Sequence, residues 1–275
     1  MRKFYCDIFV LLSLLFTVST VSVAEDYSGV YTTGSSTVAP LVAELARLYE
    51  EKKSDVRIEV ETGGSSRGVA DTLSGVVDFG MVSRSLKPEE ISLGLQEVTI
   101  AYDGIALIVH RTNPVAELTF DQIRAIYTGK ITNWKEVGGD DSQIVVVNKA
   151  QGRSTLELFL EHFALSPQDI KPSSIIGDNQ QGIKLVSGNA QAIGYVSIGA
   201  AEYEAKRGGS LKLLPLEGIE ANIANVKNRK YPLVRPLNLV MKGALRNDAK
   251  AFVDFITSNQ ASETVSKLYF VPLHE

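Results

Sequence analysis

Short apolar runs with the period of a strand alternate with longer runs that have the period of a helix along nearly the whole 275-residue chain. Residues 56–60 alternate as in a strand, and apolar side chains recur at helical spacing over 38–49. Such alternation predicts an α/β fold with mostly parallel sheets. Residues 104–110, GIALIVH, are typical of a strand buried on both faces. The polar stretch 203–230 is weakly patterned and indicates no particular element.

Residues 1–24 are typical of a secretory signal peptide. Arg2 and Lys3 precede an apolar run over 8–18, and Ser22-Val23-Ala24 offers a cleavage site of small residues. A membrane anchor, the alternative, would need about 20 apolar residues. Cys6 lies before the apolar run, so it is not a lipid-attachment cysteine and is lost on cleavage. We therefore expect an exported, periplasmic protein without a lipid anchor.

The composition of the mature chain limits the kinds of binding site that we expect in it. Beyond the leader there is no cysteine, and the three histidines are far apart, so we expect neither a metal nor a cofactor. The net charge of −4 does not fit a basic nucleic-acid-binding face. An acidic protein can still bind an anion, provided that local N–H and O–H donors act against the overall field.

One loop design occurs three times, each time before a predicted helix. Glycine and consecutive polar residues form Gly34-Ser35-Ser36-Thr37, Gly63-Gly64-Ser65-Ser66 and Gly152-Arg153-Ser154-Thr155. The first N–H groups of a helix lack intrahelical partners and carry partial positive charge, so an oxyanion fits there. The alternative is simple capping, and Ser154 and Glu157 have the spacing of a capping box. Three loops in one chain favour a shared anion site, to which Ser83-Arg84 adds a hydroxyl and a guanidinium.

Residues 64–68, GSSRG, also fit the turn that presents a nucleophilic serine in hydrolases. Ser66, then Asp103 or Asp178, then His274 occur in the required order. His274 is the penultimate residue, however, where chains usually fray. The two other histidines have simpler interpretations: His162 as a solvated surface residue and His110 as a structural one. A serine hydrolase is therefore the less favoured alternative, and we expect no enzyme.

Several segments carry a resemblance to a known family. They are TGSSTVAP, TGGSSRGVADTLSGVVDFGMVSRSLKPEE, YDGIALIVHRTNPV, LTFDQIRAIYTGKITNWKEVGG and AIGYVS, in that order along the chain. The chain resembles the phosphate-binding proteins of bacterial ABC-type phosphate importers, within the type II periplasmic binding proteins. The resemblance covers essentially all of the mature chain. In the segment IYTGKITNWKEVGG we expect Trp134 and Ile131 to pack at a helix end.

The resemblance implies a fold and a function. The fold is two α/β lobes joined by crossing strands near 104–110 and 231–241, which close like a hinge on a ligand. Residues 25–104 and 236–275 would form lobe I, and residues 105–235 lobe II. The function implied is capture of inorganic phosphate and its delivery to the permease subunits of an ABC importer, by a monomer that performs no chemistry. Sulfate, molybdate or arsenate are alternative ligands, and an adhesin that reuses the fold is a third class.

The resemblance also implies ligand-binding residues. Carried over motif by motif, they are Ser36, Thr37, Ser65, Ser83, Ser154 and Thr155. The chain departs from the family pattern in its third loop, where Lys149 stands at the position of the usual arginine. Arg153 is our substitute for that guanidinium, although it fits a solvated surface residue equally well.

Asp103 is our candidate for the acidic residue that some family members have at the position of Ser83. A buried carboxylate can accept a hydrogen bond from a protonated phosphate oxygen, whereas fully ionised sulfate would face a like charge. Asp103 fits a brace of the hinge equally well.

Overall fold

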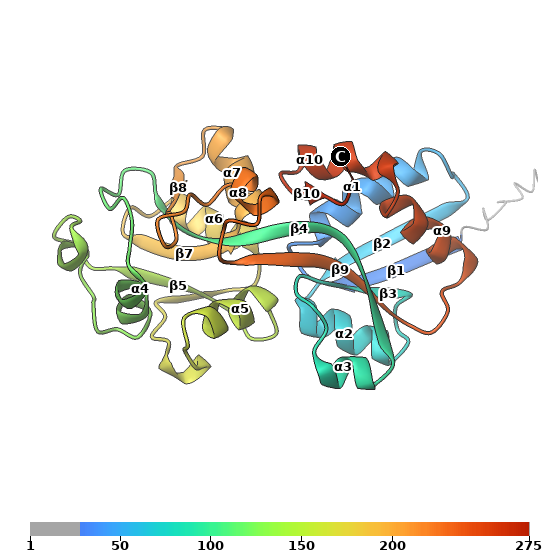
Figure 1. Cartoon of the computed structure of the whole chain (residues 1–275), viewed down its shortest axis with the longest axis horizontal. Coiled ribbons are helices and arrows are strands. Elements are labelled where there is room, and N and C mark those ends of the chain that lie inside the picture. The colour runs from blue at the N-terminus through green and yellow to red at the C-terminus, as the bar shows by residue number, and fades with distance from the viewer. Residues whose placement is uncertain (1–27, 275) are drawn as a thin grey trace, which may run out of the picture.

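Two α/β lobes joined by two long strands make up the computed structural model, which describes residues 28–274 (Figure 1). The strands β4 (Leu95–His110) and β9 (Val234–Lys242) run from one lobe into the other and pair antiparallel, with Asp103 opposite Arg235. This confirms the predicted fold class. The predicted signal peptide lies outside the described residues, and no helix within 28–274 is long and apolar enough to cross a membrane.

The first lobe is built on three parallel strands that continue into β9, in the order β2-β1-β3-β9. These strands are β1 (Ser28–Gly34), β2 (Val56–Thr62) and β3 (Phe79–Val82). The remaining elements of this lobe are α1 (Ala39–Glu50), α2 (Ser65–Leu73), α3 (Pro88–Ser92), α9 (Asn247–Ile256), η3 (Asn259–Ala261), α10 (Ser262–Lys267) and β10 (Val271–Pro272). The helix predicted over 38–49 is thus confirmed as α1, whose Leu41, Val42 and Leu45 are fully buried.

The second lobe continues the sheet from β4 in the order β4-β7-β5-β6. Its strands are β5 (Val145–Lys149), β6 (Ser174–Ile176), β7 (Ala192–Ser197) and β8 (Leu211–Leu213). Its helices are α4 (Phe120–Tyr127), η1 (Trp134–Val137), α5 (Ser154–His162), η2 (Pro167–Asp169), α6 (Asn179–Ser187), α7 (Ile198–Lys206) and α8 (Ile223–Lys227). β8 and α8 lie in the stretch without a clear sequence pattern, because elements this short cannot display a period.

Among residues 28–274 each lobe has one large and one smaller hydrophobic cluster, and the two large clusters are separated along the crossing strands. Along β4 the change from one core to the other falls between Ala101 and Ile105. Along the return path it falls between Tyr231 and Leu237. Each lobe therefore has its own core, and Val271 of β10 packs into the large cluster of the second lobe.

Trp134 lies within the segment IYTGKITNWKEVGG, at the start of η1. It is buried in the core of the second lobe, and its Nε1 donates a hydrogen bond to the backbone oxygen of Gln191 at 2.9 Å. Ile131 packs against the same core, which confirms the predicted packing role. Thr119 caps α4, because its hydroxyl accepts a hydrogen bond from the N–H of Gln122.

Candidate anion-binding site

The first two hydroxyl loops meet because they follow neighbouring parallel strands. β1 pairs with both β2 and β3, so the carboxyl ends of all three strands lie at one edge of the sheet. The backbone oxygen of Gly34 accepts hydrogen bonds from the N–H groups of Gly63 (2.9 Å) and Gly64 (2.8 Å). Gly34 has φ 138°, and a Cβ atom there would lie 2.1 Å from the backbone oxygen of Met81. A side chain at position 34 would therefore force the first loop away from β3.

Arg235, on the crossing strand β9, lies among the hydroxyl loops. Its side chain is 1% exposed. Nη1 donates hydrogen bonds to Thr155 Oγ1 (2.9 Å) and Ser83 Oγ (3.3 Å), and Nη2 donates to Thr37 Oγ1 (3.1 Å). Thr37 and Ser83 belong to the first lobe, whereas Thr155 belongs to the second. The guanidinium group thus brings together three predicted site residues, which with Arg235 we call the hydroxyl cluster.

Asp103 holds Arg235 in place from the neighbouring strand. Its Oδ2 accepts hydrogen bonds from Arg235 Nε (3.2 Å) and Nη2 (2.9 Å), and its Oδ1 accepts one from the backbone N–H of Gly199 (3.1 Å). Both groups are buried, so the ion pair is shielded from water. Since both carboxylate oxygens already accept hydrogen bonds from the protein, the geometry favours the role of a brace for Arg235 over that of a free acceptor.

The predicted serines of the first two loops have different surroundings. Ser65 Oγ accepts a hydrogen bond from the backbone N–H of Ser83 (3.2 Å) and so helps to position Ser83 in the hydroxyl cluster. Ser35 donates to Ser83 Oγ (3.0 Å) and accepts from the N–H of Thr37 (3.2 Å). Ser36 does not join the cluster and instead lines a cavity beside it.

The start of α5 holds two buried polar atoms without partners, Ser154 Oγ and Arg153 Nε. The predicted capping box is wrong, because the N-cap is Arg153 and Ser154 is already the first helical residue. From that position the Ser154 hydroxyl does not cap the helix, and Glu157 bonds to Arg84 instead. Arg153 is half-buried at the end of its loop, so the interpretation as a solvated surface residue does not fit. These unsatisfied donors at a helix N-terminus are suited to an anion.

Lys149, at the end of β5, is a buried amine next to the cluster. Its Nζ donates to Asn179 Oδ1 (3.0 Å), and Asn179 Nδ2 donates to Thr37 Oγ1 (3.1 Å). Burial lowers the pKa of Lys149 to about 7, and the positive charges of Arg235 and Arg153 contribute to this decrease.

The two lobes are in contact, and Glu157 of α5 contacts Ser66, Arg84 and Lys87 of the first lobe. Its carboxylate lies 3.0 Å from Arg84 Nε and 3.1 Å from Lys87 Nζ, and it accepts a hydrogen bond from Ser66 Oγ (3.4 Å). Arg84 is itself oriented by a bidentate ion pair with Glu90 (2.8 and 2.7 Å). Burial is the largest single effect on the pKa of Glu90 and raises it, but the hydrogen bonds from Arg84 and the Lys87 backbone, together with the charges of both residues, lower the pKa overall. We call Ser66, Arg84, Lys87, Glu90 and Glu157 together the interlobe ion-pair cluster.

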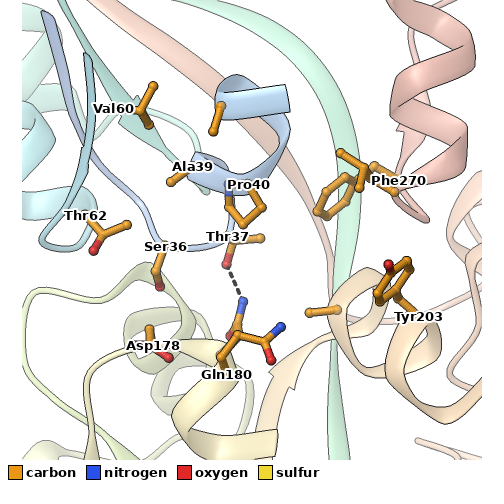
Figure 2. A pocket seen from close by; sticks show the side chains of 14 residues that line it. Ser36, Thr37, Ala39, Pro40, Val60, Thr62, Asp178, Gln180, Tyr203 and Phe270 are labelled. Atoms are coloured by element: carbon orange, nitrogen blue, oxygen red, sulfur yellow. Dashed lines mark hydrogen bonds between the residues drawn. The ribbon is translucent and has the colours of Figure 1, made fainter. Parts of the chain in front are cut away.

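A cavity of about 500 Å³ lies between the lobes beside the hydroxyl cluster. Ser36 and Thr37 lie on its first-lobe side, and Asp178 and Gln180 on its second-lobe side (Figure 2). Much of its wall is apolar; the apolar and aromatic lining residues are Ala39, Pro40, Ala43, Val60, Ala200, Tyr203, Leu268 and Phe270. Since Thr37 belongs to both, the cavity reaches the hydroxyl cluster from one side.

Among residues 28–274, Ser66, Asp103 and His274 do not form the serine–histidine–acid arrangement of a serine nucleophile. Ser66 contacts Glu157, whereas His274 contacts the backbone oxygen of Thr257. Asp103 is paired with Arg235 and does not face a histidine. The predicted solvation of His162 is wrong, because its side chain is 18% exposed and packs against the rings of Phe120 and Phe163.

Sequence reasoning missed Arg235, the residue that makes the most hydrogen bonds in the hydroxyl cluster. The available signal was an arginine within the mostly apolar run LVRPLNLVM. A charged residue in a buried strand needs a partner, and Asp103 on the other crossing strand supplies it. Asn179, which connects Lys149 to Thr37, gave no such signal because asparagine is common at helix starts.

Comparison with known proteins places the chain in a family. Residues 19–260 match the family model described as "PBP superfamily domain". A phosphate-binding protein PstS of Staphylococcus epidermidis is 30% identical over 81% of this chain and 71% of its own length. The chain therefore belongs to the PBP superfamily of two-lobed binding proteins. Within it, the chain is a member of the PstS family of phosphate-binding proteins.

Solved structures agree with this assignment. A Clostridium perfringens protein described as a phosphate ABC transporter substrate-binding protein, with bound phosphate, has a TM-score of 0.83 and 41% identity, over 90% of this chain and 100% of its own. An ABC-type phosphate transport receptor from Vibrio cholerae has a TM-score of 0.72 and 30% identity, over 88% and 99% of the two chains.

Proposed function

We propose that this protein captures inorganic phosphate between its two lobes and delivers it to the permease of an ABC importer. The observation that carries the proposal is the buried guanidinium of Arg235, which is bonded to hydroxyls from both lobes. An anion at this place would be held by hydroxyls, a guanidinium and the first N–H groups of α2 and α5. The phosphate bound to the Clostridium perfringens relative supports this choice of anion.

The other predicted site residues take supporting or direct roles in this proposal. Ser154 and Arg153 would turn their unpaired donors to the anion, and Ser36 would approach it from the cavity side. Ser65 would act through the Ser83 backbone. The protein would act as a monomer in the periplasm and would perform no chemistry on its ligand.

Removal of the Thr155 hydroxyl tests the proposal. Thr155→Val keeps the shape of the side chain and is expected to weaken phosphate binding by about 1.5–3 kcal/mol, because a hydrogen bond to a charged group is lost. Titration calorimetry with phosphate measures the change. Thr128→Val is the matched control, since that hydroxyl caps α4 far from the cluster. Equal affinities for the Thr155 variant and the wild type would contradict the proposal, as would turnover of phosphate esters by the wild-type protein.

Asp103→Asn tests which role the carboxylate has. If Asp103 braces Arg235, the variant should lose phosphate affinity by about 2–5 kcal/mol, because Arg235 loses its paired charge. Sulfate should remain as weakly bound as in the wild type. Parallel titrations with both anions distinguish the roles, with Asp254→Asn, an exposed position, as control. Tight sulfate binding by Asp103→Asn would instead identify the carboxylate as the filter against ionised anions.

A further inference from the structure

Lys149 has a buried amine that forms no ion pair with a carboxylate in the described part of the chain. Its side chain is 3% exposed, and its Nζ bonds to the neutral amide oxygen of Asn179. Among residues 28–274 it forms no ion pair, whereas Arg235 pairs with Asp103 and Arg84 with Glu90. A lysine in this situation is costly to keep charged, because its ammonium group has lost water without gaining a counter-charge.

The charged groups around Lys149 come from three other elements. Arg235 lies on β9 and Arg153 precedes α5, and both disfavour a further positive charge. Asp178, before α6, favours it, but its Oδ1 already accepts the hydrogen bond that caps that helix. The hydroxyl of Tyr195, on β7, accepts a hydrogen bond from the Lys149 backbone N–H. These surroundings lower the pKa of Lys149 to about 7, so above this pH the protein's own groups leave its amine mainly neutral.

We propose that Lys149 is a further residue of the anion site and that its amine takes up a proton from solvent when phosphate binds. The proposal rests on the proposed function, since the bound phosphate supplies the missing counter-charge. The Lys149 amine lies close to the hydroxyl cluster, because the side chain of Asn179 is hydrogen-bonded both to this amine and to the Thr37 hydroxyl. Lysine is suited to this role, whereas an arginine at this position would stay charged at every relevant pH.

The sign of the effect follows from the direction of the pKa change. A nearby anion raises the pKa of the Lys149 amine. At a pH between its pKa before binding and its pKa after binding, the amine therefore takes up a proton when phosphate binds. At pH 6 the amine is mostly protonated in both states, and uptake by Lys149 is small. At pH 8.5 the amine is mostly neutral before binding, and uptake by Lys149 approaches one proton. Phosphate affinity should accordingly decrease by up to tenfold per pH unit across this range.

Calorimetry with phosphate in buffers of different ionisation enthalpy measures the number of protons taken up. At pH 8.5 we expect the wild type to take up more protons than Lys149→Met, by close to one. Lys149→Arg should also lack this extra uptake while it keeps its positive charge. Two variants are used so that either one can test the proton uptake if the other does not fold. Lys250→Met, at an exposed position, is the control.

The possible outcomes separate this inference from the proposed function. Phosphate binding with equal proton uptake in the wild type and both Lys149 variants would overturn the inference and leave the proposed function intact. Absence of phosphate binding to the wild type would overturn both. Phosphate's own protonation is shared by all variants at a given pH, so the difference between them reports on Lys149.

Discussion

Arg235→Met is expected to abolish phosphate binding and to lower the free energy of unfolding by about 3–5 kcal/mol. The substitution removes the donor of five hydrogen bonds to Asp103 and to the hydroxyls of Thr37, Ser83 and Thr155. It also leaves the fully buried carboxylate of Asp103 without its counter-charge. Titration calorimetry with phosphate and urea unfolding measure the two effects.

A second substitution separates the two contributions of Arg235. Asp103→Asn combined with Arg235→Met should recover part of the lost stability, because no buried charge is left unpaired, but it should not recover phosphate binding. Arg246→Met is the matched control, because that arginine is largely exposed and pairs with Asp78 away from the cluster. Phosphate binding by Arg235→Met with wild-type affinity would exclude Arg235 from the anion site.

Glu157→Gln is expected to accelerate phosphate release by about tenfold or more, with little change in the association rate. Glu157 is the second-lobe partner of both Arg84 and Lys87, so its charge stabilises the closed arrangement of the lobes. Arg84 is nearly buried and would lose one of its two carboxylate partners. Such a loss acts mainly on dissociation. Stopped-flow fluorescence with phosphate measures both rates.

Glu161→Gln is the matched control for Glu157→Gln. It makes the same change one turn later on α5, at an exposed position. Small-angle scattering adds an independent measurement, because the phosphate-free Glu157 variant should be more extended than the wild type. If release and dimensions are the same in both variants, the interlobe ion-pair cluster does not hold the lobes closed.

The sequence predicted those parts of the structure that depend on local pattern. The loops that contain Thr37, Ser65 and Thr155 each carry glycine and hydroxyls between a strand and a helix, and these residues are buried near one another. The loops of Thr37 and Ser65 converge because the parallel strands before them end at one edge of the sheet. The loop of Thr155 follows β5 of the second lobe and reaches the other two across the interface between the lobes. A strand–helix alternation is therefore enough to predict that the two loops within one lobe meet, whereas the position of the third loop depends on how the lobes are arranged.

What the sequence did not predict depends on register and on exact helix boundaries. Arg235 enters the site because β9 pairs with β4 so that it lies opposite Asp103, and this register is a tertiary property. The capping box at Ser154 failed because the helix begins one residue earlier than the pattern requires. The freed Glu157 became part of an interlobe contact, which no local pattern indicates.

The central claim is that neutral donors from both lobes and one buried arginine enclose a tetrahedral anion. A crystal structure of the protein with phosphate would test this claim most directly. The account predicts phosphate oxygens at about 2.6–3.2 Å from the Arg235 guanidinium and from hydroxyls of both lobes, Thr155 among them. A phosphate bound elsewhere on the protein, or held by one lobe alone without Arg235, would contradict it.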